Sequence, residues 1–320
     1  MCRIASHSGS WYSSHKSELN QQLEQWLANV EEATEDDTVP DHGIRAIIAP
    51  HAGYAYSGQA AAYAYKCLKA DSIQRVFILG PSHHIYMSDC AVSGHTNYDT
   101  PLGTLKLDTE VIRDLQASGD FSVMSEQVDE DEHSIEMHLP YLYKMLAACH
   151  RETTVRVVPI LVGNLDPEVE ARYGRLLAPY LADPANFFII SSDFCHWGTR
   201  FRYTFYSPDD QPSSSPGRAQ QYKDFHLPIY RSIENLDREG MRAVETLDPS
   251  RFYKYLEATD NTICGRHPIL VLMHAIRSLP QSGNGGRPQL RFVYYAQSSQ
   301  VRSVHDSSVS YASAYLQIEP

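Results

Sequence analysis

The chain has 320 residues, of which 42% are hydrophobic and 21% charged, and its formal net charge is -12. A chain of this length buries a large core, and its acidic balance argues against nucleic acid as a partner. The sequence has no run of about 18 apolar residues and no apolar centre of a secretory signal near its N-terminus, so no membrane association is expected. We therefore expect a cytoplasmic or nuclear protein.

Short apolar runs alternate with helix-period segments through the first two thirds of the chain. Each run is rich in Ile, Val or Phe and ends in Gly, Pro, Ser or Asp, which is typical of buried strands. The runs are RAIIAPHAGY (45–54), RVFILGPSHH (75–84), VRVVPILVGN (155–164) and FFIISSDFCHWG (187–198). The helical segments between them are SGQAAAYAYKCL (57–68), IEMHLPYLYKMLAACH (135–150) and VEARYGRLLAPYLA (169–182). This alternation predicts βαβ winding.

The C-terminal third adds a helix and two strands. A helix is predicted within residues 262–276, with Pro268 near its first turn, and strands are predicted at 290–299 and 308–318. We therefore predict one α/β domain over residues 1–320, with a central mixed sheet flanked by helices. The Pro-, Ser- and Gln-rich stretch at about 207–224 is expected to be a flexible surface insertion, and 280–288 a turn-forming connector.

Polar side chains follow the ends of three predicted strands. His51 follows the first run, His83 and His84 the second, and Asp193 with His196 the fourth. Because the carboxyl ends of parallel strands meet at one edge of a sheet, we expect these side chains to converge. Imidazole suits iron, copper and zinc, and two histidines with one carboxylate form a familiar Fe(II) site. The pattern predicts a metal or catalytic site.

The six cysteines are scattered without a CxxC pair, so free thiols are expected. Cys67, Cys90 and Cys149 lie among Ala, Leu and Val, which favours buried thiols that pack as small hydrophobic groups. Cys264 precedes Gly265, a predicted helix start and two basic residues, an environment that stabilises a thiolate. The alternative for Cys264 is a buried thiol packed beside a turn.

The segment DEDEHSIEMHLPY mixes charge with an apolar pattern. The acidic residues 129–132 are most simply a solvated cap at a helix N-terminus. His133 and Glu136 lie three apart on one helical face and could line the pocket, either orienting a metal-bound histidine or contacting substrate. We also expect Trp11 and Tyr54 to face this pocket. His138 is interpreted as a packing or surface residue.

Eight motifs together resemble those of the Memo family, the mediators of cell motility. They are ASHSGSWY, APHAGYAYSG, GPSHHIY, DEHSIEMHLPY, SSDFCHWG, NTICGRHPI, YYAQSSQ and DSSVSYAS. The resemblance runs from about Ala5 to Tyr315. It implies a fold similar to class III extradiol dioxygenases of the LigB type.

In such dioxygenases two histidines and a glutamate hold Fe(II), and another histidine is the acid or base. By this resemblance His51 and His83 are metal ligands, His196 is the acid/base residue, and Asp193 matches a further ligand position. Cys264 stands where the glutamate would be. A thiolate is softer and can be oxidised, which argues against dioxygenase activity and for copper or iron redox chemistry.

Two functions follow from the resemblance. One is a copper- or iron-binding redox protein, with oxidoreductase activity left open, that acts in cell signalling, motility or invasive and filamentous growth. The other is a non-enzymatic adaptor whose cleft binds signalling proteins or phosphotyrosine peptides. An adaptor needs basic side chains beside the cleft, for which Arg200, Arg202 and Arg266 are candidates.

Overall fold

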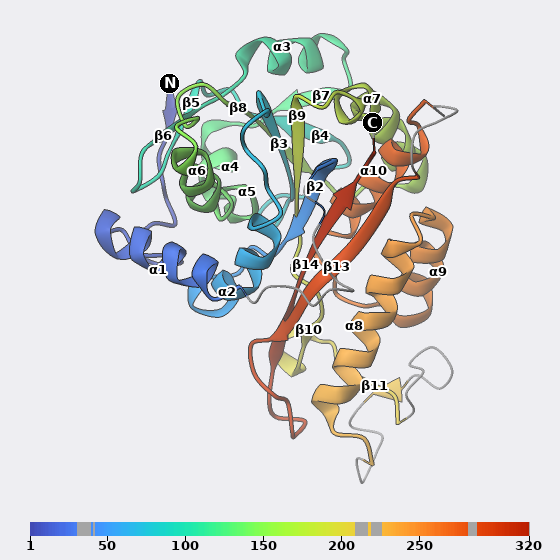
Figure 1. Cartoon of the computed structure of the whole chain (residues 1–320). Coiled ribbons are helices and arrows are strands. Elements are labelled where there is room, and N and C mark those ends of the chain that lie inside the picture. The colour runs from blue at the N-terminus through green and yellow to red at the C-terminus, as the bar shows by residue number, and fades with distance from the viewer. Residues whose placement is uncertain (31–39, 41, 209–216, 219–225, 281–286, 320) are drawn as a thin grey trace.

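A mixed sheet forms the centre of the protein (Figure 1). The computed structural model describes residues 1–30, 40, 42–208, 217–218, 226–280 and 287–319. Within this part of the chain the sheet has nine strands in the order β10-β14-β2-β9-β3-β8-β4-β7, and β13 pairs with β14. Its strands are β2 (Ile44–Ala49), β3 (Arg75–Pro81), β4 (Cys90–Val92), β7 (Phe121–Val123), β8 (Arg156–Val162), β9 (Asn186–Ser191), β10 (His196–Trp197), β13 (Gln289–Gln297) and β14 (Ser308–Gln317).

Four parallel strands form the middle of this sheet. β2 pairs with β9, β9 with β3, and β3 with β8, all in parallel. Their side chains are almost entirely buried, as expected for strands covered on both faces. Ala49 pairs with Ser191 and Pro81 with Val162, so the four strands end together at one edge. The four predicted strands are thus confirmed, and the loops that follow them start side by side.

Helices cover both faces of the sheet (Figure 1). α2 packs on β2, β13 and β14, α5 packs on β3 and β8, and α7 and α10 pack on each other and on β9. In the described residues, no helix combines the length and the apolar character needed to cross a bilayer. The helices are α1 (Lys16–Ala28), α2 (Tyr54–Tyr65), α3 (Thr109–Ala117), α4 (Glu126–Asp131), α5 (His133–Glu136), α6 (Leu139–Ala148), α7 (Pro167–Ala182), α8 (Ile229–Glu245), α9 (Pro249–Thr259) and α10 (Arg266–Arg277), with a short 3-10 turn at Thr199–Phe201.

The architecture confirms an α/β fold with a mixed sheet flanked by helices. Small additional sheets join β1 (Cys2–Arg3) to β5 (Asn97–Asp99) and β6 (Thr104–Lys106), and β11 (Phe205–Tyr206) to β12 (Gly217–Arg218). The helix expected over 135–150 is divided into α5 and α6. In the insertion expected at 207–224, residues 209–216 and 219–224 lie outside the described residues, as do 281–286 of the connector.

All six cysteines are free, as predicted. Cys67 and Cys90 are buried among apolar neighbours, but Cys149 is exposed, so the burial prediction was wrong there. Cys149 is the C-cap residue of α6. Apolar neighbours in sequence do not bury a residue at a helix end.

Candidate metal centre

Three imidazoles converge at the edge where the parallel strands end. His51 follows β2, His83 follows β3, and His133 begins α5. Each offers one ring nitrogen, and these atoms all lie within 4.8 Å of one another, which makes them the metal-capable group in the described part of the chain. The His83 and His133 rings stack at 4.4 Å between centroids, and His51 meets His83 edge-on at 5.1 Å. Of the five side chains predicted to converge, His51 and His83 belong to this group, and His133 is an additional member. His84, Asp193 and His196 lie outside it.

Hydrogen bonds fix the tautomer of buried His51. The Ser191 hydroxyl donates to the Ser134 carbonyl at 2.7 Å, so its oxygen accepts from His51 Nδ1 at 2.6 Å. The remaining lone pair of His51 is therefore on Nε2. Burial and the neighbouring histidines His83 and His133 hold the pKa of His51 well below its ordinary value. His51 is neutral near pH 7, the form that ligates metals.

Glu132 fixes His83 in the same way. Its carboxylate lies 2.9 Å from His83 Nδ1 and accepts from the backbone N–H groups of His83 (2.7 Å) and Ser134 (2.9 Å). A carboxylate only accepts, so Nδ1 carries the proton and Nε2 has the lone pair. Burial opposes ionisation, but the bonds from His83 and the charge of nearby histidines outweigh it and lower the pKa of Glu132 to about 2.

The sequence predicted that residues 129–132 form a solvated helix cap. Glu132 does cap α5, but the prediction of solvation is wrong for Asp129 and Glu132. Asp129 and Glu132 are 3% and 2% exposed. Asp129 pairs with the buried guanidinium of Arg3, and Glu132 pairs with His83. Both partners come from distant parts of the chain, which is why local charge pattern gave the wrong answer.

His133 has an unsatisfied nitrogen. Its Nδ1 is buried without a hydrogen-bond partner among the described residues, while Glu132 Oε1 lies 3.5 Å away. Burial and the neighbouring His83 lower the pKa of His133 to about 3. The Trp11 indole packs on its ring, with centroids 4.3 Å apart, so Trp11 contacts the histidine group as expected. An orphaned buried nitrogen beside two other imidazoles fits a metal ligand.

Cys264 reaches the group from the loop before α10. Its Sγ lies 3.2 Å from His51 Nε2 and accepts from the Asp193 backbone N–H at 3.3 Å. The next residue, Gly265, permits this approach, because a Cβ there would be 2.3 Å from the Ser191 carbonyl oxygen. Burial, followed by the Asp193 carboxylate, raises the pKa of Cys264 well above its usual value. The sequence favoured a thiolate at Cys264, with a buried thiol as the alternative. The raised pKa favours the thiol, which faces the lone pair of His51 Nε2.

Asp193 and His196, both predicted site residues, lie outside the three-histidine group. Asp193 Oδ1 accepts from the backbone N–H groups of His51 (2.8 Å) and Ala52 (3.3 Å), so it fixes the His51 loop and lies outside the three-histidine group. Burial raises the pKa of Asp193, although nearby His196 opposes this. His196 Nδ1 lies 3.1 Å from the Thr262 carbonyl, which can only accept, so Nε2 keeps its lone pair.

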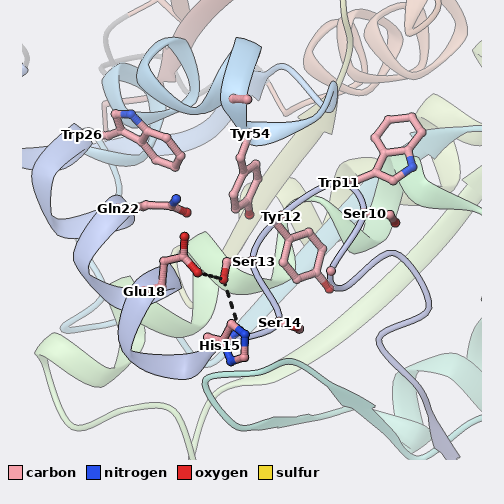
Figure 2. A pocket seen from close by; sticks show the side chains of 12 residues that line it. Ser10, Trp11, Tyr12, Ser13, Ser14, His15, Glu18, Gln22, Trp26 and Tyr54 are labelled. Carbon is pink, nitrogen blue, oxygen red and sulfur yellow. Dashed lines mark hydrogen bonds between the residues drawn. The ribbon is translucent and has the colours of Figure 1, made fainter.

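In the part of the chain that the structure describes, neither Glu136 nor Tyr54 makes a hydrogen bond to His51, His83 or His133. Buried Glu136 binds Arg3, Tyr12 and His7 instead, with His7 Nδ1 at 2.9 Å. Tyr54 donates to the Met137 carbonyl at 2.7 Å. Both Trp11 and Tyr54 line a separate cavity beside α1 (Figure 2). The role of orienting a histidine of the group, considered for Glu136, is filled by its neighbour Glu132.

Stability should decline as the pH falls below 6.5 because His138, a packing residue as expected, is neutral in the folded protein. Burial lowers the pKa of His138 to about 3. The unfolded chain takes up this proton near pH 6.5 and the folded chain does not. Stability is therefore complete above pH 6.5 and falls by up to about 1.4 kcal/mol per pH unit toward pH 3. Denaturant unfolding at pH 7, 6 and 5 measures how the unfolding free energy depends on pH. This dependence should be weaker in His138→Leu than in the wild type. An equal dependence in both proteins would show that His138 does not contribute to the loss of stability at low pH.

Comparison with known proteins adds the family. A model described as Memo-like protein matches residues 3–315. The chain is 49% identical over 318 residues to Protein MEMO1 of Mus musculus, covering 99% of this chain and 98% of that protein. It is 50% identical over 316 residues to Protein MEMO1 of Xenopus tropicalis, covering 99% and 97%.

More distant proteins also align over most of the chain. The Protein memo-1 homolog of Caenorhabditis elegans is 44% identical over 319 residues, covering 99% of this chain and 83% of that protein. The crystal structure of an uncharacterised Escherichia coli K12 protein covers 83% of this chain and 99% of its own, at 12% identity and a TM-score of 0.43, which is too low to inform function. On the family match and the full-length relatives, the chain belongs to the Memo-like protein family.

Proposed function

We propose that this protein binds one copper or iron ion at His51, His83 and His133, with Cys264 beside them, and acts in redox chemistry linked to cell signalling or motility. The observation that carries the proposal is the convergence of ring nitrogens from His51, His83 and His133 within 4.8 Å of one another. His51 and His133 have lowered pKa values, so both are available to a metal near neutral pH.

The donor set suits the proposed metals. Imidazole binds copper and iron, and a thiol that loses its proton on binding adds a soft donor that favours Cu(I). Bound copper or iron would supply one-electron redox chemistry. The chain's own part is to orient His51 through Ser191 and His83 through Glu132, and to keep a proton-accepting lone pair on His196 Nε2 nearby.

Metal analysis of protein purified without chelators or a metal-binding tag tests the proposal. We expect about one equivalent of copper or iron, or its uptake after anaerobic reconstitution. Cys264→Ser should weaken copper(I) binding, and Cys264→Glu should shift the preference toward Fe(II), because hard oxygen replaces soft sulfur. His51→Ala should lose binding in every assay. Equal copper(I) affinity in the wild type and both cysteine variants would remove Cys264 from the site.

A second candidate is an adaptor that binds a phosphotyrosine peptide beside the same histidines. Exposed apolar side chains lie in the segments that follow His51 and His83, with Tyr56 67% and Tyr86 80% exposed. Exposed Arg200 lies over the Phe201 ring, which contacts the His196 ring. This candidate is tested by titrating a phosphotyrosine peptide and its unphosphorylated form into the wild type and Arg200→Gln. The adaptor function requires that the wild type binds the phosphorylated form more tightly and that Arg200→Gln loses this preference.

A further inference from the structure

A cavity of about 420 Å³ lies between α1, the start of α2 and the segment that precedes α1 (Figure 2). It is separate from the histidine group and shares with it the residue Trp11, which lines the cavity and packs on His133. Its size lies within the range of small-molecule sites. The proposed metal chemistry leaves this cavity without a role.

Aromatic rings form its walls. The Tyr54 ring lies between those of Tyr12 and Trp26, at 5.5 Å and 5.8 Å between centroids, and the Trp26 plane is at 87° to it. Tyr12 donates its hydroxyl to Glu136, and Tyr54 donates to the Met137 carbonyl. Both hydroxyls are bonded to groups that do not line the cavity. Tyr12 and Tyr54 are only 5% and 3% exposed, so the partly exposed ring among the three is that of Trp26. Aromatic side chains around a pocket are the feature of cages that hold quaternary ammonium groups.

A single carboxylate completes the lining. Glu18 Oε2 accepts from the Ser13 hydroxyl at 2.6 Å, and Figure 2 shows the carboxyl group turned toward Gln22 and the space below Tyr54. Among the described residues, Glu18 Oε1 has no protein partner, and no Lys or Arg lines the cavity. The chain is also acidic overall, with a net charge of -12. A cation is therefore attracted here, while an anion meets an unpaired negative charge.

We propose that this cavity binds a small organic cation with an ammonium head group. The carboxylate supplies the counter-charge, and the partly exposed ring of Trp26, which packs against Tyr54, supplies cation–π attraction. The same head group occurs on a free metabolite and on a methylated lysine side chain of a peptide.

Calorimetric titration of metal-free protein with choline and with its neutral isostere 3,3-dimethylbutan-1-ol tests the proposal. Both have the same shape, so we expect choline to bind about tenfold more tightly because of its charge. Glu18→Gln should reduce this difference, because only the cation–π part of the preference then remains. Glu24→Gln is the matched control, since Glu24 is on the same helix, 69% exposed, and outside the cavity lining.

Trimethyl-lysine in a short peptide, compared with choline, distinguishes the two sources. Tighter binding of the peptide supports a protein partner, and tighter binding of choline supports a free ligand; both outcomes support an ammonium site. Equal affinity for choline and its neutral isostere would overturn the proposal. An unchanged preference in Glu18→Gln would also overturn it. The use of metal-free protein keeps this result independent of the proposed metal site.

Discussion

Replacing His133 by phenylalanine is expected to lower copper(I) affinity by more than about 100-fold, since losing even an outer-shell partner costs roughly 10- to 100-fold. The substitution keeps a flat ring against Trp11 and His83 and removes both nitrogens. The fold should be unaffected or slightly stabilised, because His133 Nδ1 is buried without a hydrogen bond. Anaerobic competition with a chromophoric copper(I) chelator measures the affinity.

His84→Phe is the matched control for this change. His84 is exposed and its ring lies 6.0 Å from that of His133, but it is not part of the three-histidine group. Its replacement should leave copper(I) affinity within experimental error. If the copper(I) affinity of His133→Phe equals that of His84→Phe, then His133 only packs beside the site and the metal is held by His51, His83 and Cys264.

Replacing Glu132 by glutamine is expected to weaken both metal binding and folding. The carboxylate accepts three hydrogen bonds, two from His83 and one from the Ser134 backbone. An amide places an N–H donor where one of these donors needs an acceptor, and it frees the His83 tautomer. We expect a roughly 10- to 100-fold loss of copper(I) affinity and about 1–3 kcal/mol less unfolding free energy at pH 7.

Asp131→Asn is the control for Glu132→Gln, since it makes the same charge change one residue away at an exposed position. The Glu132 carboxylate has a folded pKa of about 2 against an ordinary 4.5, so its stabilising effect is complete above pH 4.5 and is lost as pH falls toward 2. The two proteins should therefore differ most at neutral pH. Equal stability of both variants at pH 7 would show that Glu132 does not hold the His83 loop.

The sequence was sufficient to predict the parallel strands and the edge that gathers the histidines. Each strand is a β-branched run bounded by Gly, Pro, Ser or Asp, and both signals are local. His51 and His83 follow directly, because a residue just after a parallel strand must lie at its carboxyl edge. The mixed character of the sheet comes from β14, which pairs antiparallel with β2, and from β4, which pairs antiparallel with β8.

The surroundings of Glu132, His133 and Cys264 depend on residues that are distant in the sequence, so the local pattern could not predict them. The sequence predicts Glu132 to be a solvated cap, because its partner His83 lies far away in the chain and is brought to it by the loop after β3. His133 joins the group because α5 packs directly on β3, where Gly80 leaves room for Ser134; a Cβ at Gly80 would lie 2.5 Å from the Ser134 hydroxyl. The helix start after Cys264 predicts a thiolate, but burial and the Asp193 carboxylate raise the pKa of Cys264 and favour the thiol.

Anomalous scattering at the copper absorption edge, from crystals grown after anaerobic copper(I) loading, tests the central claim most directly. We expect one strong anomalous peak between the ring nitrogens of His51, His83 and His133, within bonding distance of Cys264 Sγ, and no peak in His51→Ala crystals treated in the same way. A wild-type map without a peak among these side chains, or with copper only at exposed surface residues, would contradict the proposed metal site.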